Sequence, residues 1–210
     1  DVPSLGNPNM NPNDIYGNYH PLFLAAEYGR FDICKHIIGK LVDKNPAQLD
    51  GVTPLYMAAE NGHYDICELI IAYVDNKNPA LHNGATPLFI AAQEGYFEIC
   101  KLIITNVDEK NPARNDGVTP LYMAAYLGNY EICKLIIENV DDKNPAKHDG
   151  ATPLFMAAQK GHYEICKLII DNVDEKNPAR LDGSSPLYIA ALKGHYAICK
   201  LIIDNVDEKN

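Results

Sequence analysis

The stretch from Asp149 to Leu181, DGATPLFMAAQKGHYEICKLIIDNVDEKNPARL, decides the fold, because most of the chain repeats it. Residues 116–148 read DGVTPLYMAAYLGNYEICKLIIENVDDKNPAKH, and residues 83–115 and 50–82 are similarly close copies. The cysteines follow the same step of 33 residues, at positions 34, 67, 100, 133, 166 and 199. A fixed period of this length is typical of a stacked repeat array.

Each repeat predicts two short helices and an extended connection. Thr152 can accept a backbone N–H at a helix start, Pro153 suits the first helical position, and Gly161 predicts the end of that helix. A second helix is expected from about Tyr163 to Asn172, because its apolar residues recur at three- and four-residue steps. The Asn-Pro and Asp-Gly pairs that follow indicate a turn-rich finger leading into the next repeat.

Stacking must stabilise these repeats, because neither helix reaches the roughly 12–15 residues at which an isolated helix is stable in water. The paired alanines of the first helix, such as Ala157 and Ala158, are small enough for close helix packing. Equivalent cysteines of stacked helices lie about 8–10 Å apart, beyond the ~7 Å limit for a disulfide. We therefore expect buried free thiols, which favours a reducing, cytoplasmic compartment.

The motifs T-P-L-x-x-A-A, G-H and E-I-C-K-L-I-I at this period resemble the ankyrin repeat over residues 17–210. The resemblance implies an all-α ankyrin-repeat solenoid of stacked helix-turn-helix units with extended β-turn fingers. We expect an N-terminal leader at 1–16 and a single ankyrin-repeat domain at 17–210, with repeats 17–49, 50–82, 83–115, 116–148, 149–181 and 182–210.

The sequence departs from the family pattern in two places. An aromatic residue, such as Phe155, replaces the usual His after T-P-L, and V-D-x-K-N-P replaces the usual Gly-containing loop after the second helix. We expect both to change local hydrogen bonding and finger shape without disturbing the fold.

The two terminal repeats differ from the internal ones. The first begins Asn18-Tyr19-His20-Pro21 where the internal repeats have Thr-Pro, and it carries extra basic residues, as expected of an end repeat. The sixth keeps an apolar second helix without a polar capping face, so we expect the natural array to continue. We also expect a monomer, with self-association through this uncapped repeat as the alternative.

Several function classes are disfavoured by the composition. The formal charge of −10 argues against nucleic-acid binding, which needs clustered Lys and Arg. The apolar runs are far shorter than the ~20 residues of a membrane span, so membrane insertion is not expected. There is also no Gly-x-Ser-x-Gly motif and no phosphate-binding Gly loop.

The histidines are the remaining candidates for catalysis or metal binding. His63, His162 and His195 occupy the same position after Gly, where they are expected to serve the turn between helices. His82 and His148 lie in fingers two repeats apart, roughly 20 Å from each other, too far to share a metal. We therefore predict no enzyme activity, no cofactor and no metal site.

Positions that vary between otherwise matching repeats gather in the fingers and at the end of the first helix. By the family resemblance, both sets line a concave groove that grips partner proteins, although neutral drift at exposed sites would produce the same variation. The predicted partner-binding residues are Leu49, Glu60, Asn61, Leu81, His82, Gln93, Glu94, Arg114, Asn115, Tyr126, Leu127, Lys147, His148, Gln159, Lys160, Arg180, Leu181, Leu192 and Lys193.

The chemical character of two neighbouring residues in this set favours a binding role. Tyr126 and Leu127 are apolar where neighbouring repeats carry Gln, Glu or Lys, and an exposed aromatic residue often dominates interface energy. Acidic positions such as Glu60 precede basic ones such as Lys160 along the chain, which predicts a partner segment of complementary polarity.

The sequence therefore predicts a non-catalytic module that binds another protein or a peptide segment. The main alternative is a structural scaffold or spacer within a longer array, or a designed or reconstructed scaffold without a cognate ligand. A third interpretation is recruitment of a protein to an enzyme fused elsewhere in the full-length chain. A recognition module should lose its partner when groove residues change, whereas a spacer should tolerate such changes.

Overall fold

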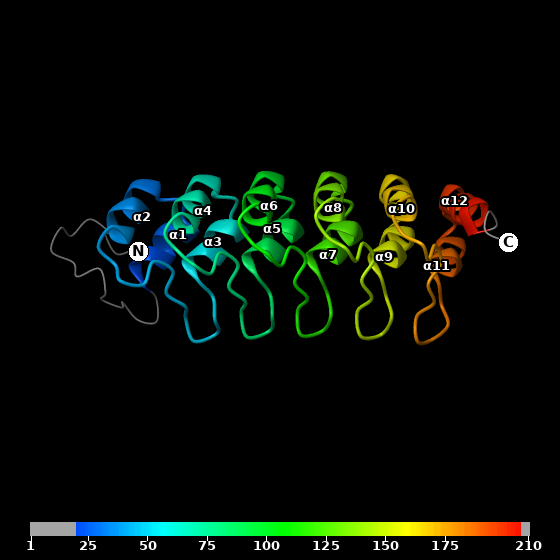
Figure 1. The fold of residues 1–210 in the computed structure, drawn as a ribbon, viewed down its shortest axis with the longest axis horizontal. Coiled ribbons are helices and arrows are strands. Elements are labelled where there is room, and N and C mark those ends of the chain that lie inside the picture. The colour runs from blue at the N-terminus through cyan, green and yellow to red at the C-terminus, as the bar shows by residue number, and fades with distance from the viewer. Residues whose placement is uncertain (1–19, 207–210) are drawn as a thin grey trace. The chain divides into compact units, whose positions relative to one another are not determined.

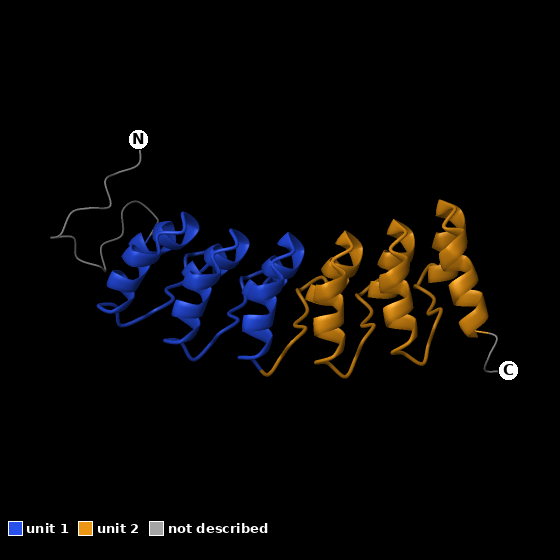
Figure 2. Ribbon diagram, turned by 90° about the horizontal axis from the view of Figure 1, so that it is seen from above, with its two compact units in different colours: residues 1–107 blue, residues 108–210 orange. Residues whose placement is uncertain are grey.

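The computed structural model describes residues 20–206, which form twelve helices with no strand assigned among them. The predicted leader at 1–16, the start of the first repeat at 17–19 and the last four residues lie outside the described residues. The chain divides into two compact units, residues 1–107 and 108–210, which Figure 2 colours separately. The expected single domain stays a prediction, and each unit is considered below by itself.

Each unit contains three helix pairs. In unit 1, the first helices of the pairs pack side by side in the order α1, α3, α5, and the second helices in the order α2, α4, α6. The bounds are α1 Pro21–Glu27, α2 Phe31–Ile38, α3 Pro54–Glu60, α4 Tyr64–Ile71, α5 Pro87–Glu94 and α6 Phe97–Ile104.

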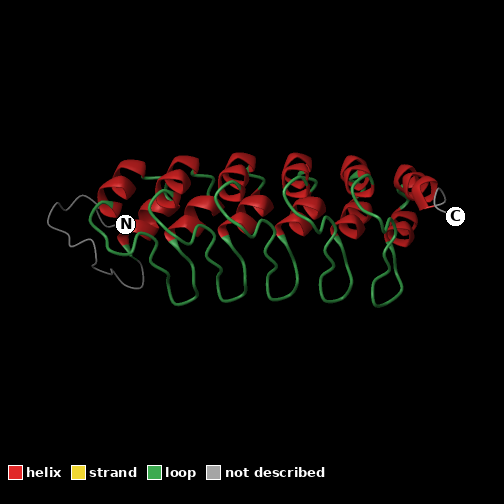
Figure 3. Cartoon of the chain, in the orientation of Figure 1, coloured by secondary structure: helices red, strands yellow, loops and turns green. Residues whose placement is uncertain are grey.

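Unit 2 repeats this arrangement. Helices α7, α9 and α11 pack in order, as do α8, α10 and α12. Within each unit the fingers project on the side of the first helices, away from the second helices (Figures 1 and 3). The bounds are α7 Pro120–Leu127, α8 Tyr130–Ile137, α9 Pro153–Lys160, α10 Tyr163–Ile170, α11 Pro186–Lys193 and α12 Tyr196–Val206.

The predicted start and end of the first helix are confirmed. Thr152 Oγ1 accepts the backbone N–H of Phe155 at 3.2 Å, and Pro153 is the first helical residue. Gly161 then ends α9 with a φ of +82°, a left-handed conformation that favours glycine. In the first repeat His20 takes the place of Thr, since its Nδ1 accepts the N–H of Leu22 at 3.1 Å.

A second cap for the first helix comes from the preceding repeat. Asn144 Oδ1 accepts the backbone N–H of Leu154 at 2.9 Å, so the V-D-x-K-N-P segment of one repeat caps the helix of the next. The same bond, also at 2.9 Å, occurs at the other four repeat junctions: Asn45–Leu55, Asn78–Leu88, Asn111–Leu121 and Asn177–Leu187.

The second helix ends earlier than predicted. Helix α10 stops at Ile170, two residues before the predicted end at Asn172. Two of its last carbonyls accept hydrogen bonds from side chains and not from the backbone of a further helical turn. Asn172 Nδ2 donates to Leu168 O at 2.9 Å, and Lys176 Nζ donates to Ile170 O. The unusual segment after the helix therefore caps one helix with its Lys and the next with its Asn.

The core lies between the two rows of helices. Leu154, Ala157, Cys166 and Ile169 are fully buried, which confirms the packing role predicted for the alanines and the cysteines. All six cysteines are free, and five are buried, whereas Cys199 in the last helix is partly exposed. Within each unit, the structure confirms the predicted all-α solenoid of stacked helix-turn-helix repeats.

Candidate binding surface

The predicted partner-binding residues occupy two structural positions in each unit. One group lies at the ends of the first helices, and the other in the fingers between one helix pair and the next. We call these two sets together the finger–helix-one surface, and describe it separately for unit 1 and unit 2.

Each finger is a tight turn followed by a short return. Gly150 N–H donates to Lys147 O at 2.8 Å, and Lys147 N–H donates to Ala151 O at 2.9 Å, which closes the turn. The carboxylate of Asp149 accepts the Ala151 N–H at 2.9 Å, a bond that fixes the finger's return. These bonds confirm the expected β-turn finger.

In unit 1 the ends of the first helices are acidic. Glu27, Glu60 and Glu94 come from α1, α3 and α5, and no basic residue stands at the ends of these three helices. Partial burial, followed by the charges of Glu94 and Glu27, raises the pKa of the Glu60 carboxyl. A cationic group placed here would relieve this repulsion.

The other unit 1 candidates differ in their hydrogen bonds and in their exposure. Asn61 Nδ2 donates to Met57 O at 2.9 Å, and Gln93 Nε2 donates to Glu94 Oε1 at 3.0 Å. In the fingers, His82 N–H donates to Asp50 O at 3.2 Å, which joins two successive fingers. The remaining unit 1 candidates are Leu49, which is 92% exposed, and the half-buried Leu81.

In unit 2 the structure brings Tyr126 and Lys160 together. Lys160 Nζ lies 4.3 Å from the centroid of the Tyr126 ring, so the cation is held over the aromatic face. Leu127, the next residue in α7, is 42% exposed. The result is an aromatic ring covered by a cation at the ends of α7 and α9, with an exposed apolar residue at the next position of α7.

The finger cations of unit 2 are largely paired with carboxylates. Asp149 Oδ2 lies 3.1 Å from Lys147 Nζ and 3.0 Å from a terminal nitrogen of Arg180. Partial burial would raise the pKa of Asp149, but the Ala151 N–H and these two cations lower it. Arg114 pairs with Asp116 at 3.3 Å.

Arg180 is the most connected of these cations. It also lies 3.3 Å from the Asp182 carboxylate, and its guanidinium carbon lies 5.0 Å from the centroid of the Phe155 ring. Lys147 and Arg180 are each paired with a carboxylate. The positive charge that the predicted gradient offers to a partner therefore comes chiefly from Lys160 and Lys193, which are exposed.

The remaining unit 2 candidates are not brought into one cluster. Gln159 is half-buried at the end of α9, and Leu192 and Lys193 are exposed at the end of α11. The fingers expose three further candidates, Asn115, His148 and Leu181.

The repeated histidines join successive repeats. His162 stands at the start of α10, as predicted, and its Nε2 lies 3.2 Å from Tyr126 O in the preceding repeat. His195 makes the same contact with Gln159 O at 3.3 Å, and His63 with Glu27 O at 3.0 Å. These rings bond the backbone carbonyls at the end of the first helix and make no bond to its side chains in these three contacts.

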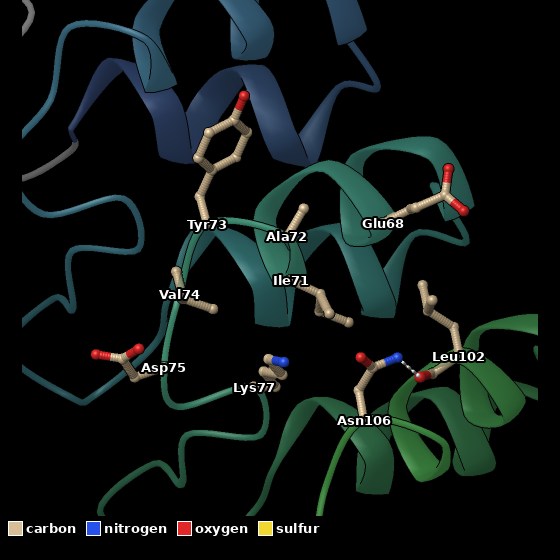
Figure 4. A pocket seen from close by; sticks show the side chains of 9 residues that line it. All are labelled: Glu68, Ile71, Ala72, Tyr73, Val74, Asp75, Lys77, Leu102 and Asn106. Carbon is tan, nitrogen blue, oxygen red and sulfur yellow. Dashed lines mark hydrogen bonds between the residues drawn. The ribbon is translucent and has the colours of Figure 1, made fainter.

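A separate open cavity of about 440 Å³ lies in unit 1 at the ends of α4 and α6. Figure 4 shows that Tyr73 points away from the other lining side chains, while Asn106 is bonded to Leu102 O at 2.9 Å. None of the predicted partner-binding residues lines this cavity, which is formed on the side of the second helices.

Residues 20–206 bear on two further possibilities, metal binding and membrane insertion. That range contains no group of three or more His, Cys, Asp or Glu side chains arranged to hold a metal ion. None of its helices combines the length and the apolar character needed to cross a bilayer.

Sequence reasoning missed three contributors to the unit 2 surface: Asp149, Phe155 and Asp182, which hold Arg180. A signal for the two aspartates exists, because a basic residue precedes an Asp by two positions at 114 and 116, 147 and 149, and 180 and 182. This spacing recurs with the period of the repeat and marks the paired finger.

The comparisons with known proteins agree with the repeat pattern. A family model described as ankyrin repeats (3 copies) matches four overlapping segments, residues 5–79, 22–114, 74–147 and 136–210. A comparison with curated proteins found no significant match.

Proposed function

The chain belongs to the ankyrin-repeat family, and from this premise we propose that it is a non-catalytic module that binds a partner protein or peptide through its finger–helix-one surface. Ankyrin repeats are generally protein–protein interaction modules. The particular surface and its residues are our proposal.

The contact between Tyr126 and Lys160, with Leu127 exposed beside it, supports this role most directly. The bond that joins these two repeats uses the backbone carbonyl of Tyr126 and not its ring, so the framework does not require this side chain. A preformed aromatic platform with a cation above it suits a partner that presents an apolar side chain beside an acidic one.

The acidic ends of the first helices in unit 1 favour a partner that also carries a basic stretch. Glu60 is held near Glu27 and Glu94, so a basic stretch of the partner would lower the repulsion there. The formal charge of −10 agrees with a protein partner and disfavours a nucleic acid. The buried free thiols support recognition in a reducing, cytoplasmic compartment.

The test is capture of a partner by the parent chain and by a variant carrying Tyr126→Ala, Leu127→Glu and Lys160→Glu. A matched control carries Glu131→Ala, Lys134→Ala and Glu138→Ala, three exposed residues of α8 and its end. We expect the parent and the control to capture the same protein and the surface variant to lose it. Equal capture by all three would contradict the proposed surface.

A structural role is the second candidate. The asparagine caps and histidine bonds tie each repeat to its neighbour within a unit, as a stiff spacer would require. If the chain is a spacer, the surface variant should keep the function of the full-length protein. A variant without the asparagine caps or the histidine bonds should lose that function. The surface variant, compared with a variant that lacks a joining bond such as His162→Ala, therefore separates the two roles.

A further inference from the structure

We propose that the phenol hydroxyl of Tyr122 is a specificity-determining group of the unit 2 surface, and that it donates a hydrogen bond to an uncharged amide oxygen of the partner. That oxygen belongs to the partner's backbone or to an Asn or Gln side chain. This inference rests on the proposed function of the finger–helix-one surface, and adds a contact that the residues predicted from variation do not include.

Tyr122 lies on α7, one turn before Tyr126. Residues four apart on a helix share one face, so both tyrosines are on the same side of α7. The charges of Asp149 and Arg180, which come from two fingers, act on the Tyr122 hydroxyl, and so does the phenol of Tyr126. The hydroxyl therefore adjoins both parts of the surface in unit 2, the finger ion pairs and the aromatic end of α7.

The packing of the repeat does not require this hydroxyl. Phe89 in α5 and Phe155 in α9 occupy the equivalent position, and they are 2% and 4% exposed. Tyr122 is 8% exposed, so its ring is buried in the same way. The ring accounts for the packing, and the hydroxyl is an additional polar group placed at its edge.

No described residue satisfies this hydroxyl. Within residues 20–206, Tyr122 has one side-chain partner, Thr119 Oγ1, which accepts its backbone N–H at 3.2 Å, and none for its hydroxyl. The nearby cations Lys147 and Arg180 both contact Asp149 Oδ2 instead. A polar group that is nine-tenths withdrawn from water and unpaired costs free energy, which an acceptor on the partner would recover.

The hydroxyl is suited to donate. Burial, and after it the charge of Asp149, raises the pKa of Tyr122 to about 12, so the proton stays in place at neutral pH. A hydroxyl without its own partner can turn its proton toward an arriving oxygen.

The charges around the hydroxyl favour an uncharged acceptor. Each carboxylate of the unit 2 fingers is matched by a cation two residues before it, in the pairs Arg114–Asp116, Lys147–Asp149 and Arg180–Asp182. These pairs neutralise one another, so the fingers offer no net charge to offset the hydration that a carboxylate or an ammonium group would lose there. An amide oxygen carries a much smaller desolvation cost and accepts the same bond.

The probe is a library of random peptides displayed on phage and selected on the parent chain. The peptides taken forward are those whose binding is lost in the surface variant Tyr126→Ala, Leu127→Glu and Lys160→Glu. Their Kd is then measured by calorimetric titration with the parent chain and with Tyr122→Phe. We expect Tyr122→Phe to raise the Kd about three- to tenfold, the loss of one hydrogen bond between neutral groups.

Two controls separate recognition from folding. Tyr130→Phe removes a hydroxyl from the start of α8, where the residue is 36% exposed, and should leave the Kd unchanged. The urea midpoint of Tyr122→Phe should not fall below that of the parent, because Phe155 fills the equivalent site without a hydroxyl. A fall in the midpoint alongside the rise in Kd would assign the hydroxyl to the framework and overturn the proposal.

Substitutions in the peptide identify the acceptor. If replacing one Asn or Gln of the peptide by alanine abolishes the effect of Tyr122→Phe, the acceptor is a side-chain amide. If the effect survives every such replacement, a backbone carbonyl is the acceptor, and an ester in place of its peptide bond should reduce the effect. Both results support the proposal. An effect that disappears when an Asp or Glu of the peptide is replaced identifies a carboxylate and overturns it.

An unchanged Kd in Tyr122→Phe overturns the proposal, and so does an equal rise in Tyr130→Phe. Peptides that depend on Tyr126 and Lys160 but not on Tyr122 remove this inference and leave the proposed function standing. If the library yields no peptide that depends on Tyr126, Leu127 or Lys160, the proposed function fails as well. The two failures are therefore distinguishable.

Discussion

Asn144 Oδ1 accepts the backbone N–H of Leu154 at 2.9 Å, a bond that reaches from the end of one repeat to the first helix of the next. Together with Thr152, which accepts the N–H of Phe155, it satisfies two of the free donors at the start of α9. The same pair of caps recurs at α3, α5 and α7, so each of these first helices also depends on a residue of the repeat before it.

Asn144→Ala should lower the free energy of unfolding by about 1–2 kcal/mol, since a helix-capping side chain is lost and the Leu154 N–H loses its partner. Urea unfolding followed by circular dichroism measures the loss. The matched control is Asn172→Ala, which removes an exposed bond to a carbonyl four residues back. An equal, small effect of both changes would show that the cap between repeats contributes little.

His162→Ala should destabilise the chain by about 1–2 kcal/mol, because the ring bonds to Tyr126 O and packs against Gly128 of the preceding repeat. The exposed finger residue His148 provides the control, and His148→Ala should be nearly neutral. The same unfolding measurement applies. If His148→Ala were the more damaging change, the role given to His162 would be wrong.

Cys133→Ser should cost about 1–3 kcal/mol, because it buries a hydroxyl in an apolar site. Cys199→Ser, at a partly exposed position, should cost less. Burial raises the pKa of the Cys133 thiol to about 12, so the thiolate is scarce at neutral pH. In the native chain, a thiol reagent should therefore label Cys199 before Cys133, as mass spectrometry of the digested protein can show. Rapid native labelling of Cys133 would contradict its burial.

Glu60→Gln should stabilise the chain near neutral pH. The pKa of Glu60 is raised above its ordinary value of 4.5, so the folded state holds the proton more tightly than the unfolded state. Stability is therefore lost as pH rises from about 4.5 through the raised pKa, and the variant avoids this loss. Unfolding at about pH 7 should show the gain, and unfolding at about pH 4 should show it reduced. A gain of equal size at both pH values would rule out the carboxylate as its cause.

Much of the fold could be predicted from the sequence, because the same repeat motif occurs six times along the chain. Thr152, Pro153 and Gly161 mark the first helix by their own backbone preferences, so its limits could be predicted from local rules. The end of the second helix could not, because the apolar pattern continues to Val173 whereas α10 stops at Ile170. The periodicity of apolar residues does not show where side chains such as that of Asn172 bond the last carbonyls.

The site was predicted less completely for a similar reason. Variation between repeats located Tyr126 and Lys160, but only the structure shows that the ring and the cation touch. The partners of Arg180 were missed because Asp149 and Phe155 recur with little change, and recurring residues were assigned to the framework. A framework residue can also hold a variable one in place.

The affinity of a captured partner for Tyr126→Ala tests the central claim most directly. Calorimetric titration should show a loss of about 2 kcal/mol or more, roughly a thirtyfold rise in Kd, if the ring is a central contact. The urea midpoint should change little, because the ring is partly exposed and its contact with Lys160 is worth about 0.5–1 kcal/mol at such a site. An unchanged Kd with an unchanged urea midpoint would contradict recognition through this surface.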